Sequence, residues 1–176
     1  NDTLRMQDGY EGILFEWFVE NSTGSNIYVA DYDSDVSWTT LQALGRDTSN
    51  QSSSSDFEAL DSALGSSSYG DSINITFTSG GSPIETSNMT IFYKTIENVP
   101  VVNSTNNSNF KTGILWDYGD GNTNFNQSQD VIFVTTINEG MPGYNDTYDF
   151  EIRIPASLRS YLGPDSEYVV FYTEII

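Results

Sequence analysis

Apolar and polar residues alternate with a period of two near the start of the chain, and this pattern predicts β-strands. Residues 13–19 place their bulkier apolar side chains on one side of the alternation. That side consists of Ile13, Phe15, Trp17 and Val19. A turn-forming segment at 21–26 leads to a second apolar run at 27–30. We expect these two runs to pair as a hairpin.

From residue 72 onward, short β-rich runs alternate with turn signals. The runs lie at 73–77, 89–96, 112–116, 131–137, 148–154 and 168–176. Segments rich in Gly, Pro, Asn and Asp separate them, at 80–83, 103–109, 120–122 and 140–143. This spacing is typical of a β-sandwich built from hairpins and longer connections.

Three short segments show helical spacing instead. Ser37 is placed to cap a helix in which Trp38, Leu41 and Leu44 share one face, ending at Gly45. A second helix is expected from Asp56 to Gly65, and a third from Pro155 to Gly163. The serine-rich stretch between the first two, at 46–56, is expected to be an exposed loop.

These elements predict a mainly β fold, a β-sandwich or jelly roll, with an immunoglobulin-like arrangement as one option and two or three short helices. With 176 residues the chain is long enough for a self-sufficient core. We expect one β-sandwich domain at 21–176, preceded by an N-terminal strand segment at 1–20. That segment either pairs within its own domain or serves as a donor strand for another molecule.

Composition excludes several kinds of partner. The net charge of −19 repels polyanions, and the six basic residues form no cluster, so neither nucleic acid nor an anionic membrane surface is an expected ligand. No stretch approaches the roughly 20 apolar residues of a spanning helix, so no membrane span is expected in the mature chain.

Cysteine and histidine are both absent, which removes disulfides, thiolate and histidine catalysis, and the usual transition-metal ligands. Carboxylate chemistry of the glycosidase kind remains open, but no pair among the 25 acidic residues stands out. We therefore expect no enzymatic activity and no required cofactor.

Acceptor motifs for N-linked glycans recur along the whole chain. Nine of the 16 asparagines begin Asn-x-Ser/Thr, against about four expected by chance. They are Asn1, Asn21, Asn50, Asn74, Asn88, Asn103, Asn106, Asn126 and Asn145. The chain also starts at Asn and not Met, so we expect a secreted, glycosylated mature chain at the cell surface. An Asn- and Ser-rich surface that yields such motifs incidentally is the alternative.

Alternating carboxylates at Asp31, Asp33 and Asp35 resemble the first half of a calcium loop. Val36 and Gln42 stand where an EF-hand needs glycine and glutamate, so only another type of calcium site remains. A plain acidic turn is the alternative.

The segment 116–122, WDYGDGN, resembles the Trp-Asp-Phe-Gly-Asp-Gly signature of PKD domains, immunoglobulin-like modules of archaeal and bacterial surface proteins. The segment 141–144, MPGY, matches a corner of that family, whereas its downstream histidine is absent. From the residues alone, Trp116 is expected to anchor the core and Asp-Gly to form a tight turn. Asp117, Asp120 and Asn122 are candidate calcium ligands.

In composition and architecture the chain resembles archaeal extracellular filament and tube subunits such as threads, bundling pili and cannulae. The resemblance implies a structural subunit of a filament, tube, sheath or S-layer, with identical subunits or other surface-layer proteins as partners. Ile13, Phe15, Trp17 and Val19 would form its self-assembly strand. The alternative is a monomeric adhesion or ligand-binding module with calcium-stiffened loops.

Overall fold

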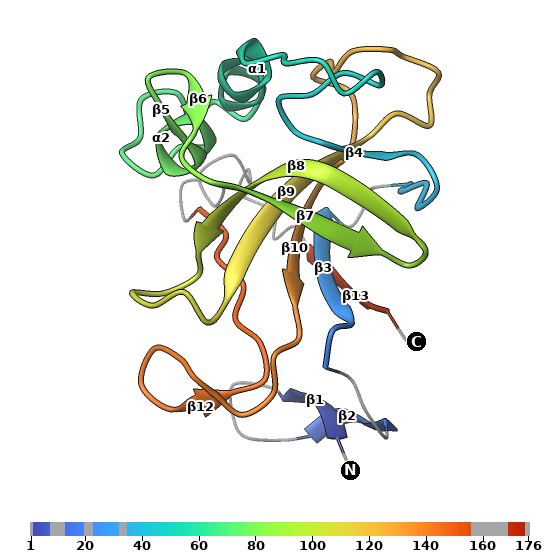
Figure 1. Ribbon diagram of the computed structural model, residues 1–176, viewed down its shortest axis with the longest axis vertical. Helices are drawn as coiled ribbons and strands as arrows, with labels where there is room; N and C mark the ends of the chain where they lie inside the picture. The colour runs from blue at the N-terminus through green and yellow to red at the C-terminus, as the bar shows by residue number, and fades with distance from the viewer. Residues whose placement is uncertain (1, 8–12, 20–22, 32–34, 156–168, 175–176) are drawn as a thin grey trace.

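A computed structural model describes residues 2–7, 13–19, 23–31, 35–155 and 169–174 (Figure 1), and for 2–7 and 13–19 it describes the backbone. The fold is mainly β and sandwich-like, as the sequence predicts.

The main sheet has seven strands, and all its pairs are antiparallel. Six of them follow one another in the order β13, β3, β10, β9, β8 and β7. Their bounds are Val169–Thr173, Asn26–Asp31, Val131–Thr136, Lys111–Asp117, Lys94–Asn103 and Thr86–Ile91. The seventh, β4 at Leu41–Ala43, pairs with the end of β9 that β8 leaves free.

Strand β8 belongs to two parts of the sheet. Its last residues, Val101 to Asn103, pair with β9, while its earlier part pairs with β7. The β7–β8 ribbon therefore leaves the plane of the sheet and crosses in front of its central strands (Figure 1). Its apolar residues pack with one face of β3, β10 and β9, including Tyr28, Leu115 and Val134.

The opposite face of the sheet is covered mainly by two helices, α1 at Ser55–Ala63 and α2 at Ile73–Phe77. Phe57 and Phe77 from these helices pack with Ile114 and Trp116 of β9. The central strands are thus buried on both faces, which explains why residues 114–116 form an unbroken apolar run. Helix α1 and the core position of Trp116 confirm the sequence predictions.

The helix expected from Ser37 to Gly45 is wrong. The Asp117 carboxylate accepts hydrogen bonds from the Ser37 amide and the Thr40 hydroxyl, at 2.6 and 2.7 Å, and fixes this segment as a loop. The next residues extend along β9 as β4. A long-range contact with β9 therefore overrides the helical spacing.

The strand expected at 73–77 is also wrong, because these residues form α2. The Ser72 hydroxyl caps this helix by accepting from the Ile75 amide. The Asp61 carboxylate of α1 accepts from the Ile73 and Asn74 amides, at 2.7 and 2.9 Å. These bonds satisfy the free amides of the first turn, so the local β pattern does not decide the conformation.

Two other strand predictions need correction. The run at 89–96 is split by a turn at Phe92 and Tyr93 into β7 and β8. In the run at 148–154, only Tyr148 is in a strand, the short β12 at Thr147–Tyr148, which pairs with β11 at Met141–Pro142. Ile152 and Ile154 pack against the core on the face of the sheet that α1 and α2 cover, without forming a strand.

The expected hairpin between 13–19 and 27–30 is not formed. Strand β2 at Ile13–Val19 pairs with β1 at Asp2–Gln7 in a separate two-stranded sheet, while β3 pairs with β10 and β13. A further small sheet joins β5 at Thr78–Ser79 to β6 at Ser82–Pro83. The helix predicted from Pro155 lies outside the described residues except for its first one.

Candidate functional site

Strand β13 forms one edge of the main sheet, with β3 as its partner. The Glu174 amide donates to the Asn26 carbonyl at 3.0 Å, which fixes the alternation of hydrogen-bonded pairs between the two strands. By this alternation, the N–H and C=O groups of Val169, Phe171 and Thr173 point away from β3. None of the described strands pairs with this side.

Within the described residues, the β13 strand carries none of the usual sequence features that protect an edge from pairing with another chain. Residues 169–173 include no charged residue and no proline, and their register with β3 has no bulge. Val169 is 56% exposed and Phe171 is 49% exposed. An uncharged, regular edge strand with exposed apolar side chains is a typical template for strand addition.

A buried polar network holds the C-terminal end of β13 in place. Glu174 is only 4% exposed, and its carboxylate accepts from the Asn26 amide nitrogen and the Tyr28 hydroxyl, both at 2.8 Å. The same Asn26 nitrogen donates to the Thr90 carbonyl of β7 at 2.7 Å, and the Thr136 hydroxyl of β10 donates to its oxygen at 2.9 Å. The edge strand is therefore fixed to three neighbouring strands.

Burial and the Glu174 carboxylate raise the pKa of the Tyr28 phenol far above its ordinary value. The hydroxyl therefore remains a hydrogen-bond donor to Glu174 throughout the neutral and moderately alkaline range.

Aromatic rings pack against β13 on the face of the sheet that the β7–β8 ribbon covers. Tyr172 packs edge-on against Trp38 at a centroid distance of 5.0 Å, and Trp38 packs edge-on against Tyr28 at 4.9 Å. Phe92, at the turn between β7 and β8, completes this cluster, with φ at +53°. Such backbone is strained for a bulky side chain, and it occurs at the first position of the two-residue turn that joins β7 to β8.

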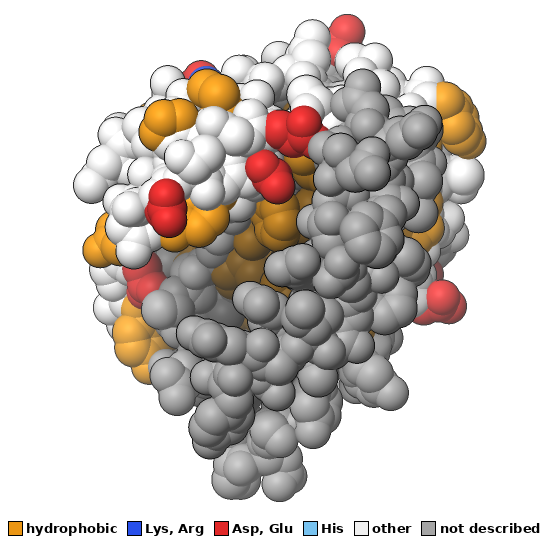
Figure 2. Space-filling view, turned by 90° about the horizontal axis from the view of Figure 1, so that it is seen from below, with side chains coloured by type: hydrophobic (Ala, Val, Ile, Leu, Met, Phe, Trp, Pro, Cys, Tyr) orange, Lys and Arg blue, Asp and Glu red, His pale blue; other side chains and the backbone are white. Residues whose placement is uncertain are grey.

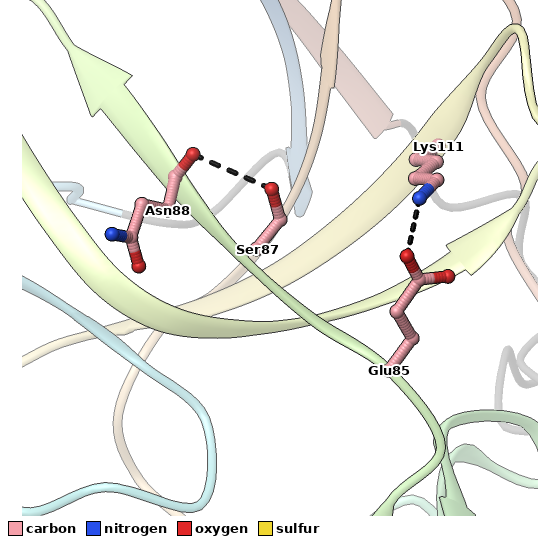
Figure 3. A network of polar contacts seen from close by, with 4 residues as sticks. All are labelled: Glu85, Ser87, Asn88 and Lys111. Atoms are coloured by element: carbon pink, nitrogen blue, oxygen red, sulfur yellow. Dashed lines mark hydrogen bonds and ion pairs between the residues drawn. The ribbon is translucent and has the colours of Figure 1, made fainter.

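The second edge of the main sheet, β7, differs from β13. The Thr90 carbonyl, which points outward on β7, already accepts from Asn26. Asn88 is exposed in the middle of the strand, and its carboxamide points away from the Lys111–Glu85 ion pair (Figure 3). Asn88 also begins an acceptor motif, so this edge carries a candidate glycan.

Seven of the nine acceptor asparagines lie in the described part of the chain, and none of these seven is buried. Asn88, Asn106, Asn126 and Asn145 are exposed, whereas Asn50, Asn74 and Asn103 are half-buried. Asn1 and Asn21 lie outside the described residues. Glycosylation of all nine asparagines stays a prediction. The seven described asparagines lie at the surface, as attachment of a glycan requires.

The calcium hypothesis for Asp117, Asp120 and Asn122 stays a prediction, and the Asp117 carboxylate is already bonded to neighbouring groups of the protein. Its two carboxylate oxygens accept from Ser37, from Thr40 and, at 2.7 Å, from the Gly119 amide, so they hold the loop and the turn together. Asp120 and Asn122 are exposed in that turn. Within the described ranges, no three acidic side chains lie close enough to hold a metal ion.

Asp31 and Asp35 are exposed, and Asp33 lies outside the described residues. The calcium hypothesis for these three residues stays a prediction.

The predicted self-assembly strand is a strand in the structure, but not one of the main sheet. In the β1–β2 register, Phe15 lies opposite Met6, Trp17 opposite Leu4 and Val19 opposite Asp2. Ile13 lies opposite Gln7, after an irregularity next to Met6. The sequence did not predict that β13 lies at an edge with no described partner on its outer side. The apolar run at 168–176 was the signal available for it.

Comparisons with protein-family models, with curated proteins and with solved structures found no match. The protein is therefore classified by its fold alone, as a mainly β, sandwich-like protein. The resemblances to PKD domains and to archaeal filament subunits stay predictions. In the described part of the chain, no helix has the length and apolar character needed to cross a membrane.

Proposed function

We propose that this chain is a structural subunit of an extracellular surface assembly, such as a filament, tube, sheath or S-layer, which associates by β-strand addition. The observation that carries the proposal is the uncharged β13 edge, which pairs with no described strand on its outer side and has Val169 and Phe171 exposed. Edge strands of this kind normally carry charge, proline or a bulge when a protein must stay monomeric.

Two further features support an extracellular, non-enzymatic role. Acceptor asparagines are distributed over the surface from β7 to the β11–β12 hairpin. In the coloured part of the face seen in Figure 2, carboxylates lie among apolar patches and almost no basic side chain is visible. A glycosylated, acidic surface suits a secreted protein, and without histidine or cysteine the chain has little to offer for catalysis.

Negative-stain microscopy and light scattering test the proposal directly. The full chain is expected to form polymers, and a variant lacking residues 1–20 is expected to remain a folded monomer. Near-UV circular dichroism checks that this variant keeps its aromatic core. If the full chain stays monomeric at all protein concentrations in 1 M NaCl, with and without millimolar calcium, the proposal is wrong.

One observation favours a second candidate, a monomeric adhesion or ligand-binding module. The β7–β8 turn presents Tyr93, which is 84% exposed, next to Phe92 with its strained backbone. Exposed aromatic rings on a strained turn are typical of a ligand contact. In that case the chain would be monomeric, and Tyr93→Ala would abolish binding to a glycan array without changing stability.

A further inference from the structure

We infer that the β13 edge accepts strand β2 of a second copy, and that β7 does not take part, so that assembly is head-to-tail. This inference rests on the proposed function and names the two strands that meet. It assigns one donor strand and one acceptor edge to each subunit.

The acceptor edge offers a regular set of backbone groups. Val169, Phe171 and Thr173 direct their N–H and C=O groups to the free side at two-residue intervals. Phe171 lies opposite Val29 and Val169 opposite Asp31, so both exposed side chains are on the helix-covered face of the sheet. A strand that adds here extends that face and covers Val169 and Phe171.

The apolar sequence of β2 is the reason for naming it as the donor strand. Glu16 is the only charged residue of β2, and the apolar residues occupy both alternations of the strand. Such a run is typical of a strand with neighbours on both sides and both faces buried. Within the described structure, β2 pairs only with β1, and an isolated two-stranded hairpin is marginally stable in water.

The β7 edge is excluded on two grounds. Its outward carbonyl at Thr90 is already bonded to Asn26, which interrupts the row of free acceptors. Asn88 begins an acceptor motif in the middle of the same strand, and the register between β7 and β8 is irregular there, between Ser87 and Met89. By contrast, neither β2 nor β13 contains an acceptor motif, because residues 2–20 contain no asparagine and Asn145 is the last asparagine of the chain.

The pairing of two different strands determines the symmetry. An interface between β2 of one copy and β13 of the next is heterologous, so each added subunit leaves a new free edge. Such contacts generate open filaments, whereas pairing of β13 with itself would stop at a dimer.

Proline substitutions test the edge without removing a bond of the protein's own sheet. The Phe171 amide points away from β3, so Phe171→Pro removes an outward donor and keeps the β3–β13 ladder. We expect this variant to be a folded monomer that loses polymerisation. Phe171→Ala separates the loss of the ring from the loss of the N–H group. Thr86→Pro, at an outward position of β7, is the matched control and should polymerise like the unmodified chain.

The inference is overturned if Phe171→Pro polymerises normally, or if Thr86→Pro abolishes polymers. These outcomes differ from a failure of the proposed function, in which the unmodified chain forms no polymer at all.

Because the chain has no cysteine, single cysteines report the contact itself. A Phe171→Cys population is mixed with one carrying Ile13→Cys, Phe15→Cys, Trp17→Cys or Val19→Cys, and then oxidised under assembly conditions. At least one mixture should give a mixed disulfide dimer, since cross-strand neighbours meet the distance that a disulfide needs. Cross-linking of Phe171→Cys mainly with itself, or with Thr86→Cys, would contradict the inference.

Discussion

Tyr28 and Glu174 form the buried polar contact on which the position of the edge strand depends. The Tyr28 ring is fully buried between the sheet and the β7–β8 ribbon. Among the described residues, its hydroxyl and the Asn26 amide nitrogen donate to the Glu174 carboxylate. A buried carboxylate that loses a donor is costly, because water cannot replace the missing bond.

We predict that Tyr28→Phe lowers the free energy of unfolding by about 1–3 kcal/mol, since it removes a hydrogen bond to a charged group. Urea unfolding at pH 7 measures the effect. Tyr93→Phe is the matched control, and it should change stability by less than about 0.5 kcal/mol because Tyr93 is 84% exposed. Equal effects of both substitutions would contradict this role of the network.

The pH dependence of the same contact has a definite sign. The pKa of Tyr28 is raised in the folded protein by burial and by Glu174, so its contribution to stability is complete below pH 10, near the unfolded pKa, and is lost as the pH rises further. The free energy of unfolding should fall more steeply above pH 10 in the unmodified chain than in Tyr28→Phe. Parallel pH profiles from urea unfolding would refute the assignment.

Gly113 is the residue that allows the β7–β8 ribbon to lie close to the sheet. A Cβ atom at this position would lie 2.8 Å from the Met89 sulfur and 2.9 Å from a Val99 methyl carbon. Gly113→Ala should therefore destabilise the fold by about 1–3 kcal/mol through overpacking. Gly70→Ala, where no heavy atom lies within 4 Å, is the control for thermal unfolding and should be nearly neutral. Equal stability of the two variants would show that the ribbon can shift outward at little cost.

Among the elements, α2 shows how tertiary contacts select a conformation that its own sequence does not favour. Its five residues, INITF, include two isoleucines, a threonine and a phenylalanine, which suit a strand better than a helix. Asp61 lies 12 residues before the helix and caps it from α1.

We predict that Asp61→Ala destabilises the protein by about 2–3 kcal/mol, because its carboxylate accepts from two amides of α2 and from the Ser66 hydroxyl. Asp61→Asn keeps one acceptor oxygen and should lose less. Denaturant unfolding together with far-UV circular dichroism measures both variants. Full stability of Asp61→Ala would show that α2 does not depend on this cap.

The sequence predicted those elements whose local pattern and buried environment agree. The strands around Ile114 and Phe133 are such elements, and α1 with Phe57 and Leu60 on its buried side is another. It failed at 37–45, where Asp117 acts across 80 residues on Ser37, and at 73–77, where Asp61 caps the helix. It also could not show which strand lies at an edge, because strand order depends on pairings far apart in the sequence.

At the scale of the whole molecule, charge opposes the proposed association. Each copy carries a net charge of −19, and its side chains include only six basic residues. The described Lys94 and Lys111 are already bonded, to the Leu41 carbonyl and to Glu85. Contact between identical copies therefore brings like charges together, and the ions of the medium must screen them.

We predict that polymerisation increases strongly between about 0.05 and 1 M NaCl, since the screening length falls to about 3 Å at 1 M. Light scattering at constant protein concentration measures this dependence. Polymers that dissolve as salt is added would show that attraction between charges, and not strand addition between acidic subunits, holds them together.

The most direct test of the central claim is negative-stain microscopy of the full chain and of Phe171→Pro, side by side in 1 M NaCl. The account predicts filaments for the full chain and folded monomers for Phe171→Pro, since the substitution removes only an outward amide and the ring beside it. Filaments of equal number and length in both samples would contradict it, because the β13 edge would then play no part in assembly.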